Sequence, residues 1–99
     1  MEVKYSRAMQ RKLKDEKTIA RYYGELKGKI LFCISVLLAS DCLEQVPNVP
    51  PTRRHKLVGQ TNCWALDLSA NWRMIVNGID GQIPSSITVI EIIDIEDYH

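Results

Sequence analysis

Apolar and polar side chains alternate most regularly between residues 63 and 76. From Trp64 to Leu68 every second side chain is large and apolar, which is the period of a strand with one buried face. The alternation breaks at Asn71 and resumes over residues 72–76, so this stretch predicts a β-hairpin. Asparagine tolerates the left-handed backbone region, which suits it to the turn. Arg73 is then a charge fixed to a rigid and otherwise apolar strand.

In the segment before this hairpin, the apolar residues have the spacing of a helix. Over residues 18–39 the apolar side chains recur at intervals of three and four, which predicts one long amphipathic helix. Gly24 and Gly28 each cost a helix interior about 1 kcal/mol relative to alanine, and they allow a kink or a break there. A shorter basic helix is predicted over residues 7–14, with Ser6 as its N-cap.

The other segments predict short strands and loops. Residues 87–93 are apolar on both faces, which favours a central strand covered on both sides. Helices followed by strands predict an α+β fold, with N-terminal helices packed on one face of a mainly antiparallel, twisted sheet, and residues 1–99 are predicted to form a single domain. The remaining expected elements are a strand over residues 3–5, a capped turn over residues 40–45, a connector containing Pro47, Pro50 and Pro51, a strand over residues 52–58, a turn over residues 59–62, and a turn at Asn77-Gly78 or Asp80-Gly81.

Composition narrows the cellular setting. The chain is 45% hydrophobic and 25% charged, ordinary values for a globular protein, which excludes disorder. Cys33, Cys42 and Cys63 form no Cys-x-x-Cys pair, which predicts reduced thiols and a cytoplasmic location. The apolar stretch over residues 30–39 is far shorter than the roughly 20 residues of a membrane span, and the charged N-terminus does not match a signal peptide. We therefore expect no membrane association.

Charge is distributed unevenly although the net charge is only +1. Basic residues crowd the first 29 positions and residues 53–56, and acidic residues crowd the last nine. His55 and His99 are the side chains that titrate near neutrality without help. Cleavage of a phosphodiester without a metal needs cations for the phosphate and groups that move protons. The candidates for these roles are Arg53, Arg54, His55, Lys56, Arg73, Asp97, Tyr98 and His99.

The same residues have purely structural interpretations. A basic run such as residues 53–56 is most often a solvated strand edge, and a terminal Tyr-His is usually a frayed end. Trp64 and Trp72 are more often core residues than a platform for nucleobases. A zinc site would need ligand spacing that the sequence lacks, so we predict no metal and no cofactor; the residues considered for it are His55, Cys63, Asp97 and His99.

Four segments in the second half of the chain form a specific combination. They are His55-Lys56-Leu57-Val58-Gly59, Cys63-Trp64, Ala70-Asn71-Trp72-Arg73-Met74-Ile75 and the terminal Asp97-Tyr98-His99. This combination resembles the HigB-type killer toxins of the RelE superfamily, the toxin halves of bacterial type II toxin–antitoxin pairs. The resemblance covers residues 52–99, whereas the first half agrees only in helical character and length.

The resemblance implies a small α+β domain that enters the ribosomal A site and cuts mRNA there without a metal, the RNA 2′-hydroxyl attacking its own phosphodiester. Arg73 would stabilise the charge on the phosphate, and His99 would be the main proton donor or acceptor. The pattern does not decide which group is acid and which base. The other implied roles are positioning and acid–base help by His55, Asp97 and Tyr98, and RNA binding by Arg53, Arg54 and Lys56.

The implied partners are the ribosome with its mRNA and a cognate helix-turn-helix antitoxin similar to HigA, in a complex that can hold more than one copy of each chain.

Two departures weaken the match. Relatives often carry lysine where this chain has Val58, and a basic residue at the position of Asp67 or Ser69. Each lost cation weakens phosphate binding, and Asp67 would repel the RNA backbone if it faces the site.

Two alternatives remain open at this stage. ParE-type toxins of the same superfamily bind DNA gyrase and lack the nucleolytic residues, and a degenerate relative would keep only a binding role. The presence of Arg73 together with Tyr98 and His99 favours the nuclease.

Overall fold

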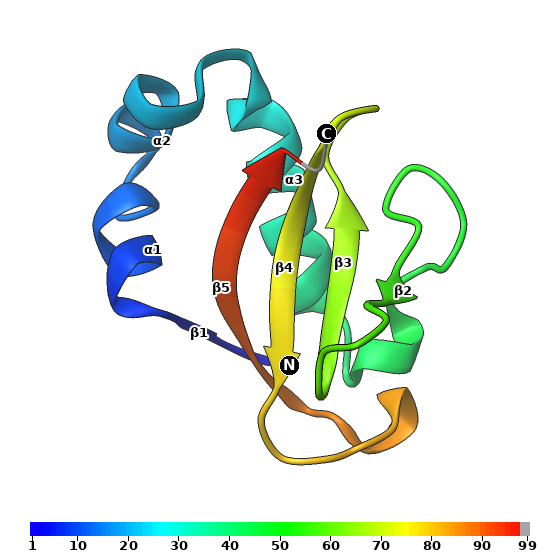
Figure 1. Ribbon diagram of the computed structural model, residues 1–99. Coiled ribbons are helices and arrows are strands. Elements are labelled where there is room, and N and C mark those ends of the chain that lie inside the picture. The colour runs from blue at the N-terminus through cyan, green and yellow to red at the C-terminus, as the bar shows by residue number, and fades with distance from the viewer. Residues whose placement is uncertain (98–99) are drawn as a thin grey trace.

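A five-stranded sheet and three α-helices make up residues 1–97, the part of the chain that the computed structural model describes (Figure 1). The strands lie in the order β1-β5-β4-β3-β2, with β1 parallel to β5 and all other neighbours antiparallel. The strands are β1 (Glu2–Tyr5), β2 (His55–Lys56), β3 (Cys63–Asp67), β4 (Trp72–Gly78) and β5 (Val89–Asp97). The helices are α1 (Arg7–Lys12), α2 (Glu16–Tyr23) and α3 (Lys27–Ala39), with short 3₁₀ turns η1 (Gly24–Leu26), η2 (Leu43–Gln45) and η3 (Pro84–Ser86).

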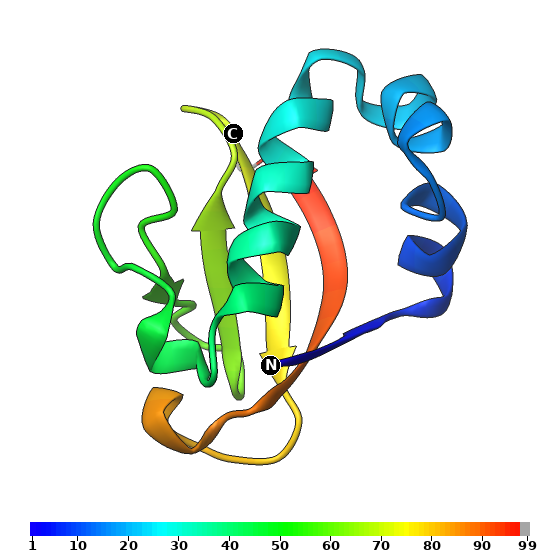
Figure 2. The same cartoon turned by 180° about the vertical axis from the view of Figure 1, so that it is seen from behind.

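The helices cover one face of the sheet. Helix α3 runs across that face, and α1 and α2 lie beside the edge formed by β5 and β1 (Figures 1 and 2). Ile30 and Leu37 of α3 share one core with Met74 of β4 and Ile92 of β5, and all four are fully buried. Burying a side chain of this size contributes about 1.5–3 kcal/mol. The predicted α+β fold, with helices packed on a mainly antiparallel sheet, is confirmed.

The long helix predicted over residues 18–39 is wrong, because the chain breaks at Gly24. Its φ of +55° lies in the region that glycine adopts without a steric penalty, and its N–H donates to the carbonyl of Ala20. Helix α2 therefore ends there, and α3 begins after the turn η1 in a new direction. Asp15 starts α2 two residues earlier than predicted, since its carboxylate accepts the N–H of Thr18 at 2.7 Å.

The strand predicted over residues 52–58 is reduced to His55–Lys56. The preceding chain folds back on itself: the N–H of Arg53 donates to the carbonyl of Val49, and the N–H of Arg54 donates to that of Pro47, each at 2.9 Å. Arg53 has a φ of +44°, which no strand residue adopts. These backbone donors are used within the loop, so they are not available to β3.

The last strand is longer and less covered than residues 87–93 predict. β5 (Val89–Asp97) lies between β1 and β4, so its internal position is confirmed. Ile90 and Ile92 are fully buried under the helices, whereas Ile93 on the other side is only partly covered. Coverage on both faces is confirmed only in part: the helices pack on one face, and on the other Ile93 packs against a smaller buried cluster and stays partly exposed. The members of this cluster are Leu57, Cys63, Ala65 and Ile75.

The central hairpin matches its prediction closely. β3 and β4 pair from Cys63 to Asp67, and the N–H groups of Leu68 and Ser69 both donate to the carbonyl of Trp72 at the turn. Among the described residues, the positive φ angles outside glycine occur at Arg53 and Asn62, so the turn does not use the left-handed region at Asn71. Of the two turns considered after this hairpin, the one at Asn77-Gly78 is excluded, because β4 continues through Gly78, and the chain bends at residues 79–80 instead.

Asp80 ties this second turn to the start of β5. Its carboxylate accepts the N–H groups of Thr88 at 2.8 Å and Val89 at 3.0 Å, and it also accepts the hydroxyl of Thr88. The hydroxyl hydrogen bond, followed by the N–H of Val89, lowers the pKa of Asp80 below its ordinary value of 3.8. Because the pKa of Asp80 is lower in the folded state than in the unfolded state, its ionised form stabilises the fold. This stabilisation is fully present above the unfolded-state pKa and is lost as the pH falls through the folded-state pKa.

Asp80→Asn should therefore be less stable than the wild type near neutral pH, and the difference should disappear as the pH falls from about 5 to about 2. The asparagine keeps an acceptor for the same donors but cannot ionise. Thermal unfolding of both proteins across this range is the measurement. A difference in Tm that stays constant with pH would show that the charge of Asp80 contributes nothing.

Candidate functional site

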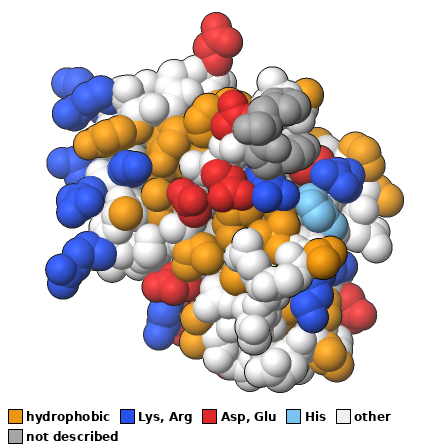
Figure 3. Space-filling view, in the orientation of Figure 1, with side chains coloured by type: hydrophobic (Ala, Val, Ile, Leu, Met, Phe, Trp, Pro, Cys, Tyr) orange, Lys and Arg blue, Asp and Glu red, His pale blue; other side chains and the backbone are white. Residues whose placement is uncertain are grey.

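Charged side chains of both signs gather on the face of the sheet opposite α3 (Figure 3), and four of them form a row. Asp67 on β3, Arg73 on β4 and Glu96 on β5 lie opposite one another in strand register. Residues opposed in this way project from the same face of a sheet, so these three side chains stand next to one another. Arg53 extends the row beyond Asp67. Two arginines alternate with two carboxylates, and the formal charges of the row cancel.

Arg73 is held by Glu96. Its Nε and Nη2 atoms donate to the same carboxylate oxygen, Oε1, at 3.0 and 2.7 Å. The Arg73 side chain is 20% exposed and that of Glu96 35%, so the pair is partly shielded from water. A charge-assisted pair of this kind is stronger than one on an open surface. The guanidinium predicted to bind phosphate is therefore rigidly placed, and a phosphate must compete with Glu96 for its N–H groups.

A bulge in β5 brings Glu96 to this face. Ile92 and Asp94 lie opposite consecutive residues of β4, so Ile93 is an extra residue on β5. Strict alternation from Ile92 would turn Glu96 toward the helices, and our sequence analysis did not include it among the site residues. The signal that could have found it is Ile95, which is apolar where the alternation predicts an outward residue.

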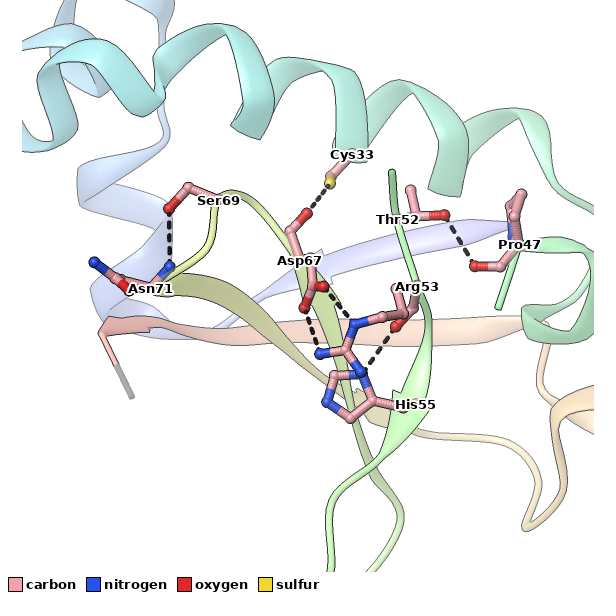
Figure 4. A network of polar contacts seen from close by, with 8 residues as sticks. All are labelled: Cys33, Pro47, Thr52, Arg53, His55, Asp67, Ser69 and Asn71. Atoms are coloured by element: carbon pink, nitrogen blue, oxygen red, sulfur yellow. Dashed lines mark hydrogen bonds and ion pairs between the residues drawn. The ribbon is translucent and has the colours of Figure 1, made fainter. Parts of the chain in front are cut away.

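Arg53 neutralises Asp67, the residue expected to repel RNA. Nε of Arg53 donates to Oδ2 of Asp67 at 2.6 Å and Nη2 donates to Oδ1 at 3.1 Å, a two-pronged pair (Figure 4). The N–H of Asp67 also donates to the carbonyl of Thr52 at 2.8 Å, which attaches the loop to β3. The repulsion expected from Asp67 is thus offset locally, but the charge of Arg53 is used for this purpose.

His55 lies beside this pair with a defined orientation (Figure 4). Its Nδ1 lies 2.8 Å from the carbonyl oxygen of Arg53. A carbonyl only accepts hydrogen bonds, so Nδ1 carries the hydrogen, and Nε2 of the neutral ring is left as an acceptor. The position of His55 opposite Ala65 places the ring on the open face. His55 is therefore arranged as a proton acceptor through Nε2.

The two other basic residues of the predicted RNA-binding run point elsewhere. Nε of Arg54 donates to the carbonyl of Val46 at 2.9 Å, in the connector. Lys56 lies opposite Trp64, which faces the helices, and its Nζ is 5.8 Å from the indole centroid. The structure brings Arg53 and His55 to the charge row, and it separates Arg54 and Lys56 from them.

The C-terminal residues of the predicted site are only partly described. Asp97 ends β5 opposite Trp72 and its side chain is exposed. Tyr98 and His99 lie outside the described residues. Trp64 is 2% exposed and belongs to the core, as the structural interpretation predicts, whereas Trp72 is only partly buried.

The buried cysteines are poor nucleophiles. Burial, and next the charge of Asp67, raise the pKa of the Cys33 thiol to about 11. Burial also raises the pKa of Cys63. A thiol reacts as its thiolate, so neither is activated near neutral pH. Within residues 1–97 there is no group of three or more His, Cys, Asp or Glu side chains arranged to hold a metal ion.

The sequence matches no protein-family model and no curated protein. The fold, however, is similar to that of several solved structures. A YoeB/ParE toxin from Agrobacterium tumefaciens superposes with a TM-score of 0.63 over 100% of both chains at 14% identity. A mutant of YafQ from E. coli gives 0.63 at 14% identity, over 98% of this chain and 92% of that one. YafQ in the E. coli DinJ-YafQ complex gives 0.64 at 11% identity, over 98% and 92%.

These identities are low, so the comparison establishes a shared fold. It does not single out the HigB type. None of the helices in residues 1–97 has the length and apolar character that crossing a membrane requires.

Proposed function

We propose that this chain is the toxin of a type II toxin–antitoxin pair and a ribosome-dependent mRNA endonuclease of the RelE superfamily, of HigB type. The observation that carries the proposal is the placement of Arg73. It stands on an internal strand, on the face left open by the helices, in a fold shared with known toxins. Acting on ribosomes, the protein would work in the cytoplasm without a metal or cofactor.

The proposed chemistry uses the RNA's own 2′-hydroxyl as nucleophile. Nε2 of His55 accepts the proton of that hydroxyl, and Arg73 donates hydrogen bonds to the phosphate oxygens as negative charge develops on them. A second group must donate a proton to the departing 5′-oxygen, and we assign it to His99. Asp97 and Tyr98 position the substrate. The ribosome supplies the alignment of the mRNA, because the balanced charge row attracts free RNA only weakly.

An antitoxin is the proposed partner, and α3 offers it a surface. The helix is apolar on most of its circumference, yet Leu38 is 58% exposed and Phe32 is 47% exposed on the side turned away from the sheet. A helix that is apolar all round is normally buried. YafQ, which shares this fold, has been solved in a complex with DinJ. We propose a helix-turn-helix antitoxin similar to HigA, in a complex that can contain more than one copy of each chain.

Programmed ribosomes test the function. We expect cleavage of the mRNA in the ribosomal A site, mapped by primer extension, little cleavage of the same RNA without ribosomes, and loss of cleavage when the protein encoded by the neighbouring reading frame is added. Equal cutting of naked RNA, or none in either case, would contradict the nuclease. Cutting that the neighbouring protein leaves unchanged would contradict the partner.

The cancelled charges of the row favour two alternatives to the nuclease. A surface whose arginines are already paired with carboxylates has little net positive charge with which to attract phosphates. A ParE-like inhibitor of DNA gyrase, or a relative that has lost catalysis, would leave the ribosome-bound mRNA intact. Inhibition of gyrase supercoiling without mRNA cleavage would identify the first of these.

A further inference from the structure

A hollow of about 430 Å³ opens between α2 and the tip of the β3–β4 hairpin. Its floor is firm, because Tyr23, Leu26 and Trp72 pack against the main core. Tyr22 stands at its rim with 54% of its surface exposed. The residues around the hollow are Tyr22, Tyr23, Glu25, Leu26, Ser69 and Trp72.

Aromatic rings dominate this hollow. The ring centroids of Tyr22 and Tyr23 lie 6.4 Å apart at an interplanar angle of 46°, and the indole of Trp72 forms another wall. Flat rings of this kind stack on nucleobases, and each such contact is sequence-tolerant because every base has a π-face. Polar groups stand at the same rim: Glu25 can accept hydrogen bonds from a base edge, and the hydroxyl of Ser69 can donate one.

The surface next to the hollow is positively charged. Lysines and arginines gather over α1 and α2 in Figure 3. Lys12 lies at the rim, with its Nζ 5.8 Å from the centroid of the Tyr22 ring. Phosphates flanking a bound base would meet these cations, which outnumber the carboxylates of Asp15 and Glu16. The cations of this segment are Arg7, Arg11, Lys12, Lys14, Lys17 and Arg21.

The hollow and the charge row share one end of the sheet. Trp72 and Arg73 are consecutive residues of β4, so their side chains project to opposite faces at the place where the hairpin ends. An RNA strand passing around this end would meet Arg73 on one side and the hollow on the other.

We propose that the hollow holds one unstacked nucleobase of the single-stranded RNA on which the protein acts. This inference rests on the proposed function, since it adds a base-binding subsite to the same substrate. Stacking on Tyr22 and Trp72 gives affinity, and the basic face of α1 and α2 holds the adjoining phosphates. The subsite provides a grip on the RNA that the neutral charge row does not provide.

Tryptophan fluorescence tests the subsite without any cleavage. The chain has two tryptophans, of which Trp64 is 2% exposed and Trp72 lines the hollow, so a base that stacks there quenches Trp72 selectively. The probe is a short RNA with 2′-O-methyl riboses, which cannot be cut, and its control is the same backbone without bases. We expect quenching by the first and none by the second.

Tyr22→Ala should weaken binding by roughly 5- to 150-fold, whereas Tyr22→Phe should keep it, because phenylalanine retains the ring.

Equal binding of the backbone without bases, or unchanged affinity in Tyr22→Ala, would overturn the subsite. Quenching of Trp72 by the neighbouring protein but by no RNA would overturn it as well, and would assign the hollow to a protein partner. The measurement is independent of catalysis. Cleavage on ribosomes without quenching of Trp72 would support the nuclease and exclude the subsite. Quenching without cleavage would support the subsite and exclude the nuclease.

Discussion

Replacing Arg73 with glutamine should lower mRNA cleavage on programmed ribosomes by roughly 10²- to 10³-fold, the usual effect of removing one donor that stabilises a developing negative charge. Arg73 is suited to this role because its guanidinium is fixed on an internal strand and partly shielded from water. Arg73→Lys should recover only part of the rate, since lysine keeps the charge but not the planar pair of donors.

Stability must be separated from activity in this experiment. Arg73→Gln leaves the partly buried carboxylate of Glu96 without the donors at 3.0 and 2.7 Å, and an unsatisfied group of this kind costs about 1–3 kcal/mol. The matched control is the double variant Arg73→Gln with Glu96→Gln, which removes both charges. It should regain stability without regaining cleavage. Thermal unfolding measured beside primer extension distinguishes the two effects.

Glu96→Gln alone should act in the opposite direction. It removes the charge that competes with phosphate, so the KM for programmed ribosomes should fall.

Full cleavage by folded Arg73→Gln would instead exclude the nuclease role of Arg73 and favour the protein-binding alternative.

The pairing of Arg73 with Glu96 shows where sequence reasoning ends. The hairpin that carries Arg73 was predictable, because its alternation is strictly local. The partner was not, since Glu96 lies 23 residues further along the chain and reaches Arg73 through a bulge in β5. Local propensities do not tell which residue of a distant strand lies opposite Arg73. The charge row could therefore be recognised only in the structure.

The basic run over residues 53–56 is a different case, because the sequence could have predicted in part that its side chains point to different faces of the sheet. In any strand alternate residues point to opposite faces, so His55 must separate from Lys56 within β2. The backbone around Arg53, with its φ of +44°, could not be anticipated. The break at Gly24 was visible as a weak point, but the helical periodicity continued through it and predicted one helix in place of two.

The second large effect is expected at the two imidazoles. His55→Asn should lower cleavage by roughly 10²- to 10⁴-fold, the range of general acid–base catalysis. Asparagine can still donate to the carbonyl of Arg53, which His55 contacts at 2.8 Å through Nδ1, but it has no titratable nitrogen in the place of Nε2. If His55 serves only to hold the Arg53 loop, His55→Asn should retain activity.

His99→Ala, and a chain ending at Tyr98, should lose activity over the same range, and the Tm of each variant is measured beside it to show that it is folded. Full growth arrest by both folded variants would remove His99 from the mechanism. A gyrase inhibitor would need no imidazole there.

The pH profile of kcat/KM assigns the two roles. Loss of a general base removes the rise in rate at low pH, and loss of a general acid removes the fall at high pH. With His55 as base and His99 as acid, His55→Asn should flatten the first limb and His99→Ala the second. Groups that act in one concerted proton transfer are strongly non-additive, so the double variant should be little slower than either single one. Losses that multiply in the double variant would place the two histidines in separate steps.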